Sequence, residues 1–484
     1  LLRNQHCEIR QSRRLAHKAR DRRGSVGPNE GAQRSESGWI GCRIQGSFLN
    51  RALDLGDSRR RRLIASCLCF CLLLLGAGCS EKDTQEGDIV LEFWTIALGD
   101  AFADYINGMI ADYEELNPGV RVEWVDVSGG EVAEKFIAAL VSGDPPDLAN
   151  VYDLPRFLEH DVLSNLDSLV SGTDQDRYLP NFWRGMGQYQ GANYAFPFYG
   201  SVNMMWYNKE IFAAAGLDPE RPPTTMTEMF EMGRVIREKT GKYGVSWRLH
   251  PSLVGPPWWL LRMDDVWPLF NPDGTATTIN NAEALALFEQ WVDAYAMGVL
   301  PPEALAASSR DEVNWFIEGR AAMLPFSGGW ITRYFDESFE TKAGMTSHPL
   351  GRLGKVPANS QVLVVPRMSP HVEQAVDFGL FVTSPKYQLE FCSYVAILPT
   401  TKEAAADPFF RQPPRNLSDR ANQISYADLP NSFVAAPPDV KGWSRMEDIL
   451  YEEFARALAG QQSSQAALDR IESKWNHLLR YTNP

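Results

Sequence analysis

Early in the chain, hydrophobic residues recur with two different periods. Short apolar runs at 89–94, 120–127 and 148–152 predict strands, because they are brief and rich in β-branched and aromatic residues. Between them, apolar side chains recur every three to four positions over 102–116 and 132–141, which predicts two amphipathic helices. This order of strand, helix, strand, helix and strand predicts an α/β fold with a mainly parallel sheet and helices on both of its faces.

Further along, the pattern becomes more helical. Apolar periodicity predicts helices at 284–295, 446–458 and 466–479, whereas the short run 362–365 predicts a buried strand. The length of 484 residues favours two or three domains. We find no internal repeat and no long linker in the sequence, so we expect the domains to be joined by crossing strands.

The composition of the N-terminal segment is typical of a targeting signal rather than of a folded domain. Four arginines precede the apolar run 63–75, and small residues then lead to Cys79. This arrangement is typical of a secretory signal peptide, and the run is shorter than the about 20 residues that span a membrane. The sequence LGAGC that ends at Cys79 resembles the lipobox of bacterial lipoproteins. It implies a lipoprotein signal peptide at 56–78 and lipidation of Cys79; a secretory signal with a chance cysteine is the alternative.

The residues on either side of this signal differ in kind. Residues 79–88 are polar and predict a tether behind a lipid anchor. Residues 1–55 are rich in Arg and Ser, contain no Met and fit no targeting pattern, so we interpret them as an upstream extension from a misplaced start. Of the seven cysteines, the mature chain would keep Cys79 and Cys392. With Cys79 acylated, no intrachain disulfide can form, and stability must come from core burial.

Charge and motifs exclude several classes of function. The net charge of −14 argues against nucleic acid as the main partner. The sequence contains no Gly-x-Ser-x-Gly, no phosphate loop and no His-Glu-x-x-His, and no two histidines have metal-ligand spacing on one helix. Cys392 has apolar neighbours, which favours a buried, inert thiol over a nucleophile. We therefore predict no catalytic residue, no metal and no cofactor.

Several segments along the chain together carry a resemblance to one family. They are Ser142–Leu148, Tyr194–Pro197, Trp206–Phe212, Ala215–Leu217, Phe316–Met323, Gly328–Trp330, Leu398–Thr400 and Pro438–Trp443. In this order they resemble segments of the extracellular solute-binding proteins of family 1, the carbohydrate-binding lipoproteins of ABC importers, of which the maltodextrin-binding protein is the best known. The matches extend over nearly all of the chain after the tether.

The resemblance implies a fold, a partner and a place in the cell. The fold would be a two-lobe periplasmic-binding-protein fold of type II, in which each lobe is a mainly parallel sheet flanked by helices and the cleft lies between the lobes. Lobe 1 would comprise 89–198 plus 322–367, and lobe 2 would comprise 199–321 plus 368–484. The protein would be an extracytoplasmic monomer, anchored to the membrane by its lipid, that delivers a sugar to the permease of an ABC importer. A di- or oligosaccharide is favoured over a monosaccharide.

A sugar site needs aromatic rings for the C–H faces and polar side chains for the hydroxyls. From the resemblance, and because ligands of such sheets bind beyond the carboxyl ends of the strands, we predict a set of ligand-binding residues. They are Trp94, Asp153, Tyr199, Ser201, Asn203, Trp247, Trp258, Trp330 and Trp443. Asp153 could instead cap a helix, and Trp247 and Trp258 fit a core equally well. The best-known relative has a glutamate where Ser201 stands, and Asn203 is a candidate to replace that contact.

Three alternatives stay open from the sequence. A secreted carbohydrate-active enzyme would need two carboxylates facing a bond, and the adjacent Asp264 and Asp265 favour a loop instead. A lipoprotein that presents its ligand to a membrane sensor is the second alternative. A binding protein for a non-sugar solute, such as glycerol phosphate or a polyamine, is the third.

Overall fold

The computed structural model describes residues 89–129, 131–151, 154–249, 257–434 and 436–482. The predicted extension, signal peptide, lipidated Cys79 and tether lie outside the described residues. Among the helices of the described part, none is long and apolar enough to cross a membrane.

The first sheet contains six strands in the order β12-β11-β3-β1-β2, with β6 on the other side of β11. Their bounds are β1 Ile89–Ile96, β2 Val120–Val127, β3 Leu148–Val151, β6 Phe196–Val202, β11 Val356–Val364 and β12 Ser432–Val434. Pairing of β1 with β2 and β3 is parallel, which confirms the order predicted from the early pattern. The short run predicted as a buried strand extends to the nine residues of β11, which pairs antiparallel with β3 and β6.

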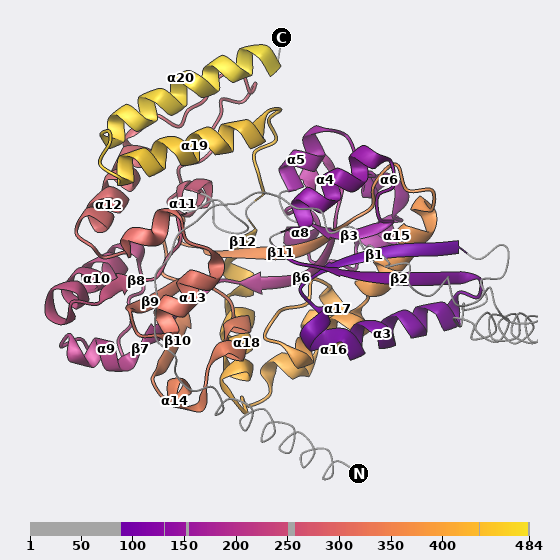
Figure 1. The fold of residues 1–484 in the computed structure, drawn as a ribbon, viewed down its shortest axis with the longest axis horizontal. Coiled ribbons are helices and arrows are strands. Elements are labelled where there is room, and N and C mark those ends of the chain that lie inside the picture. Colours follow the sequence, from indigo (N-terminus) through magenta and orange to yellow (C-terminus); the bar gives the residue numbers. More distant parts are fainter. Residues whose placement is uncertain (1–88, 130, 152–153, 250–256, 435, 483–484) are drawn as a thin grey trace, which may run out of the picture. The chain divides into compact units, whose positions relative to one another are not determined.

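Helices cover both faces of the first sheet (Figure 1). They include α3 Gly99–Leu116, α4 Val132–Ser142, α5 Leu154–Glu159, α15 Val372–Val382 and α16 Pro385–Tyr394. On one face the ring of Phe93 meets Phe378 of α15 edge-on at 5.2 Å. On the other face Phe136 of α4 packs on Phe157 of α5 at 4.9 Å. Apolar side chains at alternate positions of the strands thus point to opposite faces of the sheet, and each face packs against its own layer of helices.

The second sheet has the order β10-β7-β9-β8. Its strands are β7 Met204–Asn208, β8 Tyr243–Val245, β9 Ala321–Ser327 and β10 Ala343–Ser347. Of its pairs, β8–β9 is parallel, whereas β7–β9 and β7–β10 are antiparallel. Strands β8, β9 and β10 therefore run in the same direction, and β7, which follows directly from β6, runs opposite to them, so this sheet is mixed.

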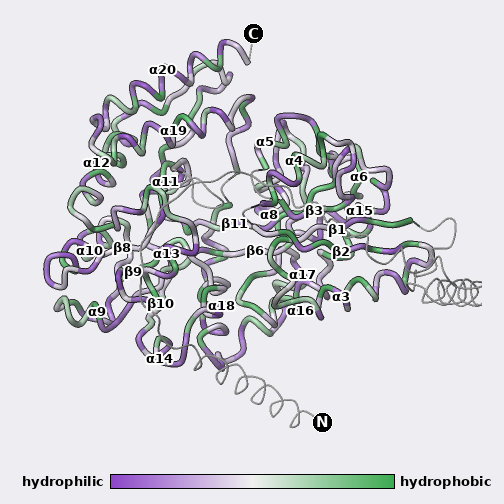
Figure 2. The backbone as a smooth tube through the Cα atoms, in the orientation of Figure 1, coloured by the Kyte–Doolittle hydropathy of each residue, from purple (hydrophilic) through white to green (hydrophobic). Residues whose placement is uncertain are grey.

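A larger helical layer surrounds the second sheet (Figure 1). Its helices are α9 Lys209–Ala214, α10 Met226–Thr240, α11 Pro257–Met263, α12 Ala282–Ala296, α13 Ser309–Ile317, η3 Gly329–Tyr334, α14 Glu337–Glu340, α18 Leu417–Asp428, α19 Trp443–Leu458 and α20 Ser464–Thr482. In Figure 2 hydrophilic and hydrophobic residues alternate along α12, α19 and α20, as expected for helices with one buried face. The predicted helices in these three places are confirmed.

Short elements complete the described chain. They are α6 Leu166–Leu169, α7 Gly172–Gln175, α8 Pro180–Trp183, β4 Gln188–Tyr189, β5 Ala192–Asn193, η2 Pro302–Leu305, α17 Lys402–Ala406, η4 Pro408–Arg411 and η5 Leu429–Asn431.

In the described part of the chain, three connections link the lobes, in addition to α18, which packs on the second sheet between α17 and β12. A single residue, Asn203, separates β6 from β7. Residues 348–355 connect β10 with β11, and the segment after β12 leads to α19. The prediction of crossing strands is thus confirmed at the first place, where an almost continuous extended segment serves both sheets.

Strand pairing and core packing assign two segments differently from the predicted lobes. Both β9 and β10 belong to the second sheet, although 322–367 was expected in lobe 1. Conversely, α15 and α16 pack on the first sheet, where Tyr105 stacks on Phe391 at 5.0 Å, although 368–484 was expected in lobe 2. The physical reason is that the chain crosses to the first sheet only after β10. The helices α15 and α16 follow β11 on that sheet and bury their apolar faces in its core.

Candidate ligand-binding site

The carboxyl end of β1 is held by one carboxylate. Asp126 of β2 accepts hydrogen bonds from the Thr95 hydroxyl at 2.7 Å and from the backbone N–H groups of Leu98 at 2.9 Å and Gly99 at 2.8 Å. Ala97 between them has a φ of +52°. The negative charge lies at the N-terminus of α3, where the helix dipole favours it. The loop that faces the carboxyl edge of the sheet is therefore fixed, and two of its donors are already used.

The predicted site residue Trp94 lies inside β1, which continues to Ile96. Its indole N–H donates to Glu92 Oε1 at 2.5 Å, and its ring meets Phe136 of α4 at 6.4 Å. The ring is half-buried on the face of the sheet that α4 covers. Asp153, which follows β3, lies outside the described residues.

Two predicted residues from different parts of the chain come together at Gly328. A Cβ placed on this glycine would lie 2.6 Å from Ser201 Oγ and 2.8 Å from Trp330 Cδ1. Ser201 belongs to β6 of the first sheet, and Trp330 lies in η3, directly after β9 of the second sheet. Both side chains are partly exposed. A hydroxyl and an indole ring thus share one spot where the two sheets approach each other.

Trp330 also has a polar neighbour. The guanidinium of Arg333 lies 5.6 Å from the centre of its ring, and Tyr334 meets the ring edge-on at 6.2 Å. The other half-buried candidate, Tyr199, pairs with Gln361 of β11 and packs its ring against Phe391 at 5.3 Å.

Asn203 occupies the link between the sheets and is 2% exposed. Its backbone N–H donates to the Pro357 carbonyl of β11 at 2.9 Å. Its side-chain Nδ2 has no hydrogen-bond partner among the described residues. A buried amide nitrogen without a partner is costly, and ligand contact by Asn203 stays a prediction.

Three predicted tryptophans belong to the core of the second lobe. The exposed fractions of Trp247, Trp258 and Trp443 are 3%, 5% and 1%. Trp443 begins α19, and its ring packs against Trp475 at 5.6 Å and against Trp258 at 6.1 Å. Ligand contact by these three rings stays a prediction, and in the described arrangement each is covered by protein.

A buried ion pair fixes the chain next to Trp247. Arg248 Nε lies 3.4 Å from Glu312 Oε1, and the Arg248 backbone N–H donates to Glu312 Oε2 at 3.0 Å. Both side chains are nearly inaccessible. Burial raises the pKa of Glu312 to about 7, and the nearby guanidinium opposes that rise. The pair therefore anchors the segment that follows β8 to helix α13.

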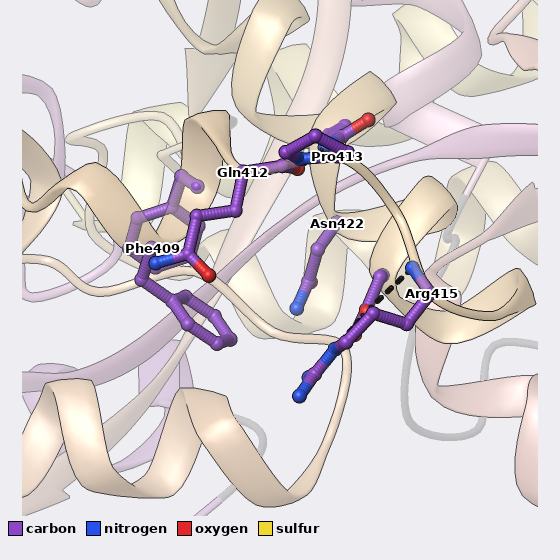
Figure 3. A pocket seen from close by; sticks show the side chains of 8 residues that line it. Phe409, Gln412, Pro413, Arg415 and Asn422 are labelled. Carbon is purple, nitrogen blue, oxygen red and sulfur yellow. Dashed lines mark hydrogen bonds and ion pairs between the residues drawn. The ribbon is translucent and has the colours of Figure 1, made fainter.

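Two surface hollows lie elsewhere. Figure 3 shows a small one of about 20 Å³ beside η4 and α18, lined among others by Phe409, Gln412, Pro413 and Arg415. It has room for about one water molecule. A larger hollow of about 410 Å³ lies against α9 and α14 at the end of β7 remote from Asn203. None of the predicted site residues is among those that line either hollow.

Three residues near the crossing are not among the predicted site residues, although Trp259 lies in a stretch of aromatic residues that fit a site or a core equally well. Phe326, Trp259 and His348 pack together, with ring centres 5.2 Å apart for Phe326 and Trp259 and 5.3 Å apart for Phe326 and His348. A His-Pro pair after a strand carries no functional signal by itself. Asp126 was missed as well, because its role depends on a loop about thirty positions earlier in the chain.

The two α/β lobes and their connections have the fold of the two-lobe periplasmic binding proteins, as the similarity to such solved structures shows. The model of the family described as bacterial extracellular solute-binding protein matches residues 99–389, and the chain belongs to this family.

Similar proteins agree with this assignment. The sn-glycerol-3-phosphate-binding periplasmic protein of Brucella abortus is 22% identical over 408 residues, which cover 79% of this chain and 92% of the relative. The structure of a proposed oligosaccharide periplasmic-binding protein from Synechococcus sp. MITs9220 has a TM-score of 0.72 at 26% identity and covers 81% of this chain and 100% of that chain. The cyclic alpha-maltosyl-1,6-maltose binding protein of Arthrobacter globiformis has a TM-score of 0.65 at 22% identity, with 82% and 100% covered. All three are named as binding proteins and not as enzymes.

Proposed function

We propose that this protein captures a sugar between its two lobes and delivers it to an ABC importer, and that it performs no covalent chemistry. The observation that carries the proposal is the meeting of Ser201 and Trp330 at Gly328. An indole face suits the C–H face of a sugar ring, and a hydroxyl beside it suits the ring's polar rim. Family membership and the names of the similar proteins support the same class of ligand.

Two helix N-termini of the described fold are already occupied by carboxylates, which favours an uncharged ligand over a phosphate. Helix N-termini are common phosphate sites. At α3 that position is taken by the Asp126 carboxylate, and at α19 it is taken by the carboxylate of Glu159. A phosphate would have to displace or approach these negative charges. Of the solutes named for the relatives, we therefore favour an oligosaccharide over sn-glycerol 3-phosphate.

The cellular setting completes the proposal. A lipid on Cys79 would anchor the protein on the extracytoplasmic side of a membrane, and the polar residues 79–88 would let a monomer reach a permease. Closure of the lobes around the sugar would exclude water and create the form that docks. Acidic groups on both lobes would contact basic sockets of the permease.

Intrinsic tryptophan fluorescence of Ser80–Pro484 tests the ligand class. The protein is titrated with maltose, maltotriose and larger oligosaccharides, with monosaccharides, and with sn-glycerol 3-phosphate, and the sugars are analysed afterwards. We expect a saturable change with an oligosaccharide that is recovered intact. Saturation by glycerol phosphate alone would replace the sugar with a charged solute. Cleavage of the sugar would favour the carbohydrate-active enzyme.

A further inference from the structure

His348 is a buried imidazole at the second crossing, directly after β10. It is 1% exposed, and its Nδ1 lies 2.7 Å from the carbonyl oxygen of Pro349. A carbonyl oxygen can only accept a hydrogen bond, so Nδ1 carries the proton. Burial lowers the pKa of His348 to about 4, and the ring is therefore neutral at pH 7. In a neutral ring protonated at Nδ1, the other nitrogen, Nε2, is a hydrogen-bond acceptor.

A buried donor without a partner in the described part of the chain lies one position beyond the same end of the β7–β10 ladder. Nε2 of His348 and Nδ2 of Asn203 are both buried without a hydrogen-bond partner among the described residues. The antiparallel register of β7 and β10 ends with Met204 opposite Ser347. One further step along both chains reaches Asn203 and His348, and residues opposite each other in such a pair have side chains on the same face. Continued by one position, the register thus places a donor and an acceptor on the same face of the sheet.

The ring that covers His348 has a strained backbone. Phe326 has a φ of +60°, which is unusual for a bulky residue. Its ring lies edge-on to His348 at 5.3 Å and rests on Trp247 at 4.9 Å and on Trp259 at 5.2 Å. The exposed fractions of Trp247, Trp259 and His348 are 3%, 3% and 1%, whereas Phe326 is partly exposed. Phe326 is therefore the outer member of this cluster.

We propose that Asn203 and His348 form a hydroxyl-recognising subsite that Phe326 covers until a ligand binds. The inference rests on the proposed sugar-binding function, adds His348 to the predicted site and gives Asn203 a defined role as hydrogen-bond donor. A sugar hydroxyl is both an acceptor and a donor. It accepts from Asn203 Nδ2, donates to His348 Nε2, and satisfies both atoms at once. When the Phe326 ring withdraws, the ring face of Trp247 becomes available to the same sugar unit.

Calorimetric titration of variants tests the subsite with the oligosaccharide that binds wild-type protein most tightly in the fluorescence panel. His348→Phe keeps a ring in the cluster but removes the acceptor, and Asn203→Leu keeps the size but removes the donor. We expect each variant to weaken binding at least about tenfold, because each loses one hydrogen bond between the ligand and a buried polar group. His477→Gln is the matched control, because His477 is exposed on α20, and its affinity should equal that of wild type.

A spectroscopic readout keeps the inference testable if a variant folds poorly. The ¹⁵N resonance of His348 Nε2 in wild-type protein should shift when the sugar is added, whereas that of His477 should not. Wild-type binding with no shift at His348, or with unchanged affinity in both variants, would overturn the subsite and leave the proposed function standing. If wild-type protein binds no sugar of the panel, the proposed function fails and the subsite falls with it.

Discussion

Glu159 at the end of α5 accepts hydrogen bonds from the backbone N–H of Ser444 at 2.8 Å and from its hydroxyl at 3.1 Å. Ser444 lies in the first turn of α19, so a carboxylate of the first lobe caps a long helix of the second. A few residues earlier, Asp439 accepts from the backbone N–H of Gln190 at 2.8 Å. Two carboxylate contacts thus tie the third crossing to the first lobe.

The cap contributes measurably to stability. Replacement of Glu159 by Ala removes a charge at a helix N-terminus, and we expect a loss of about 1 kcal/mol in the free energy of unfolding. Urea denaturation measures it. Glu452→Ala, at an exposed position on α19, is the control and should stay within about 0.5 kcal/mol of wild type. Equal stability of the two variants would show that the cap is energetically neutral.

Gly328 separates Ser201 from Trp330, and a larger residue there should disturb the site. In Gly328→Ala the new Cβ would lie 2.6 Å from Ser201 Oγ, so either Ser201 or Trp330 must move. We expect sugar affinity to fall at least about tenfold, together with an overpacking cost of about 1–3 kcal/mol. Calorimetry and thermal unfolding give the two quantities. Gly108→Ala, on a helix with open space around it, should keep full affinity; unchanged affinity in Gly328→Ala would remove this spot from the site.

His348 makes stability depend on pH with a defined sign. Its pKa falls from 6.5 to about 4 on folding because of burial. Between these values the unfolded chain binds more protons than the folded one, so folding stability decreases as the pH falls from 6.5 towards 4. The total contribution is on the order of 3 kcal/mol. Denaturation of wild type and His348→Phe at pH 7, 5.5 and 4 should show a shallower dependence for the variant. His477→Phe should follow wild type, and identical profiles for all three would contradict a buried neutral imidazole.

The pair of Arg248 and Glu312 should be far more sensitive than a surface pair. Arg248→Met leaves the Glu312 carboxylate buried without this partner, and we expect a loss of about 3–5 kcal/mol. The matched control is Arg320→Met, because Arg320 lies 3.2 Å from Glu303 at an exposed position. There we expect less than about 1 kcal/mol. Thermal unfolding in parallel compares them; similar losses would show that Glu312 is neutral in the variant or reaches solvent.

Local patterns predicted the first lobe well. The strands and helices from β1 to β3 follow from apolar periods that the backbone geometry imposes on neighbouring residues. The membership of β9 and β10 in the second sheet could not be predicted, because pairing with β7 depends on contacts more than a hundred positions apart. The sequence also does not reveal that α15 and α16 return to the first core.

The site was predicted less well than the fold, for a similar reason. Ser201 and Trp330 meet because Gly328 permits a close approach that no local pattern reveals. Gly442, with a φ of +85°, precedes the first turn of α19, and the predicted site residue Trp443 that follows it lies in the core. His348 gains significance only from its burial and from the partner of its Nδ1. Such roles belong to the three-dimensional arrangement and not to a motif.

The single-residue link at Asn203 restricts how the lobes can move. A joint of this length has no slack, so β6 and β7 cannot slide apart, and relative motion here must be a rotation absorbed by very few dihedral angles. The pivot is also held from the side, since its N–H bonds to Pro357 of β11. A ligand that binds the Asn203 side chain would therefore contact the hinge residue itself. Ligand binding and rotation of the lobes would then be directly coupled.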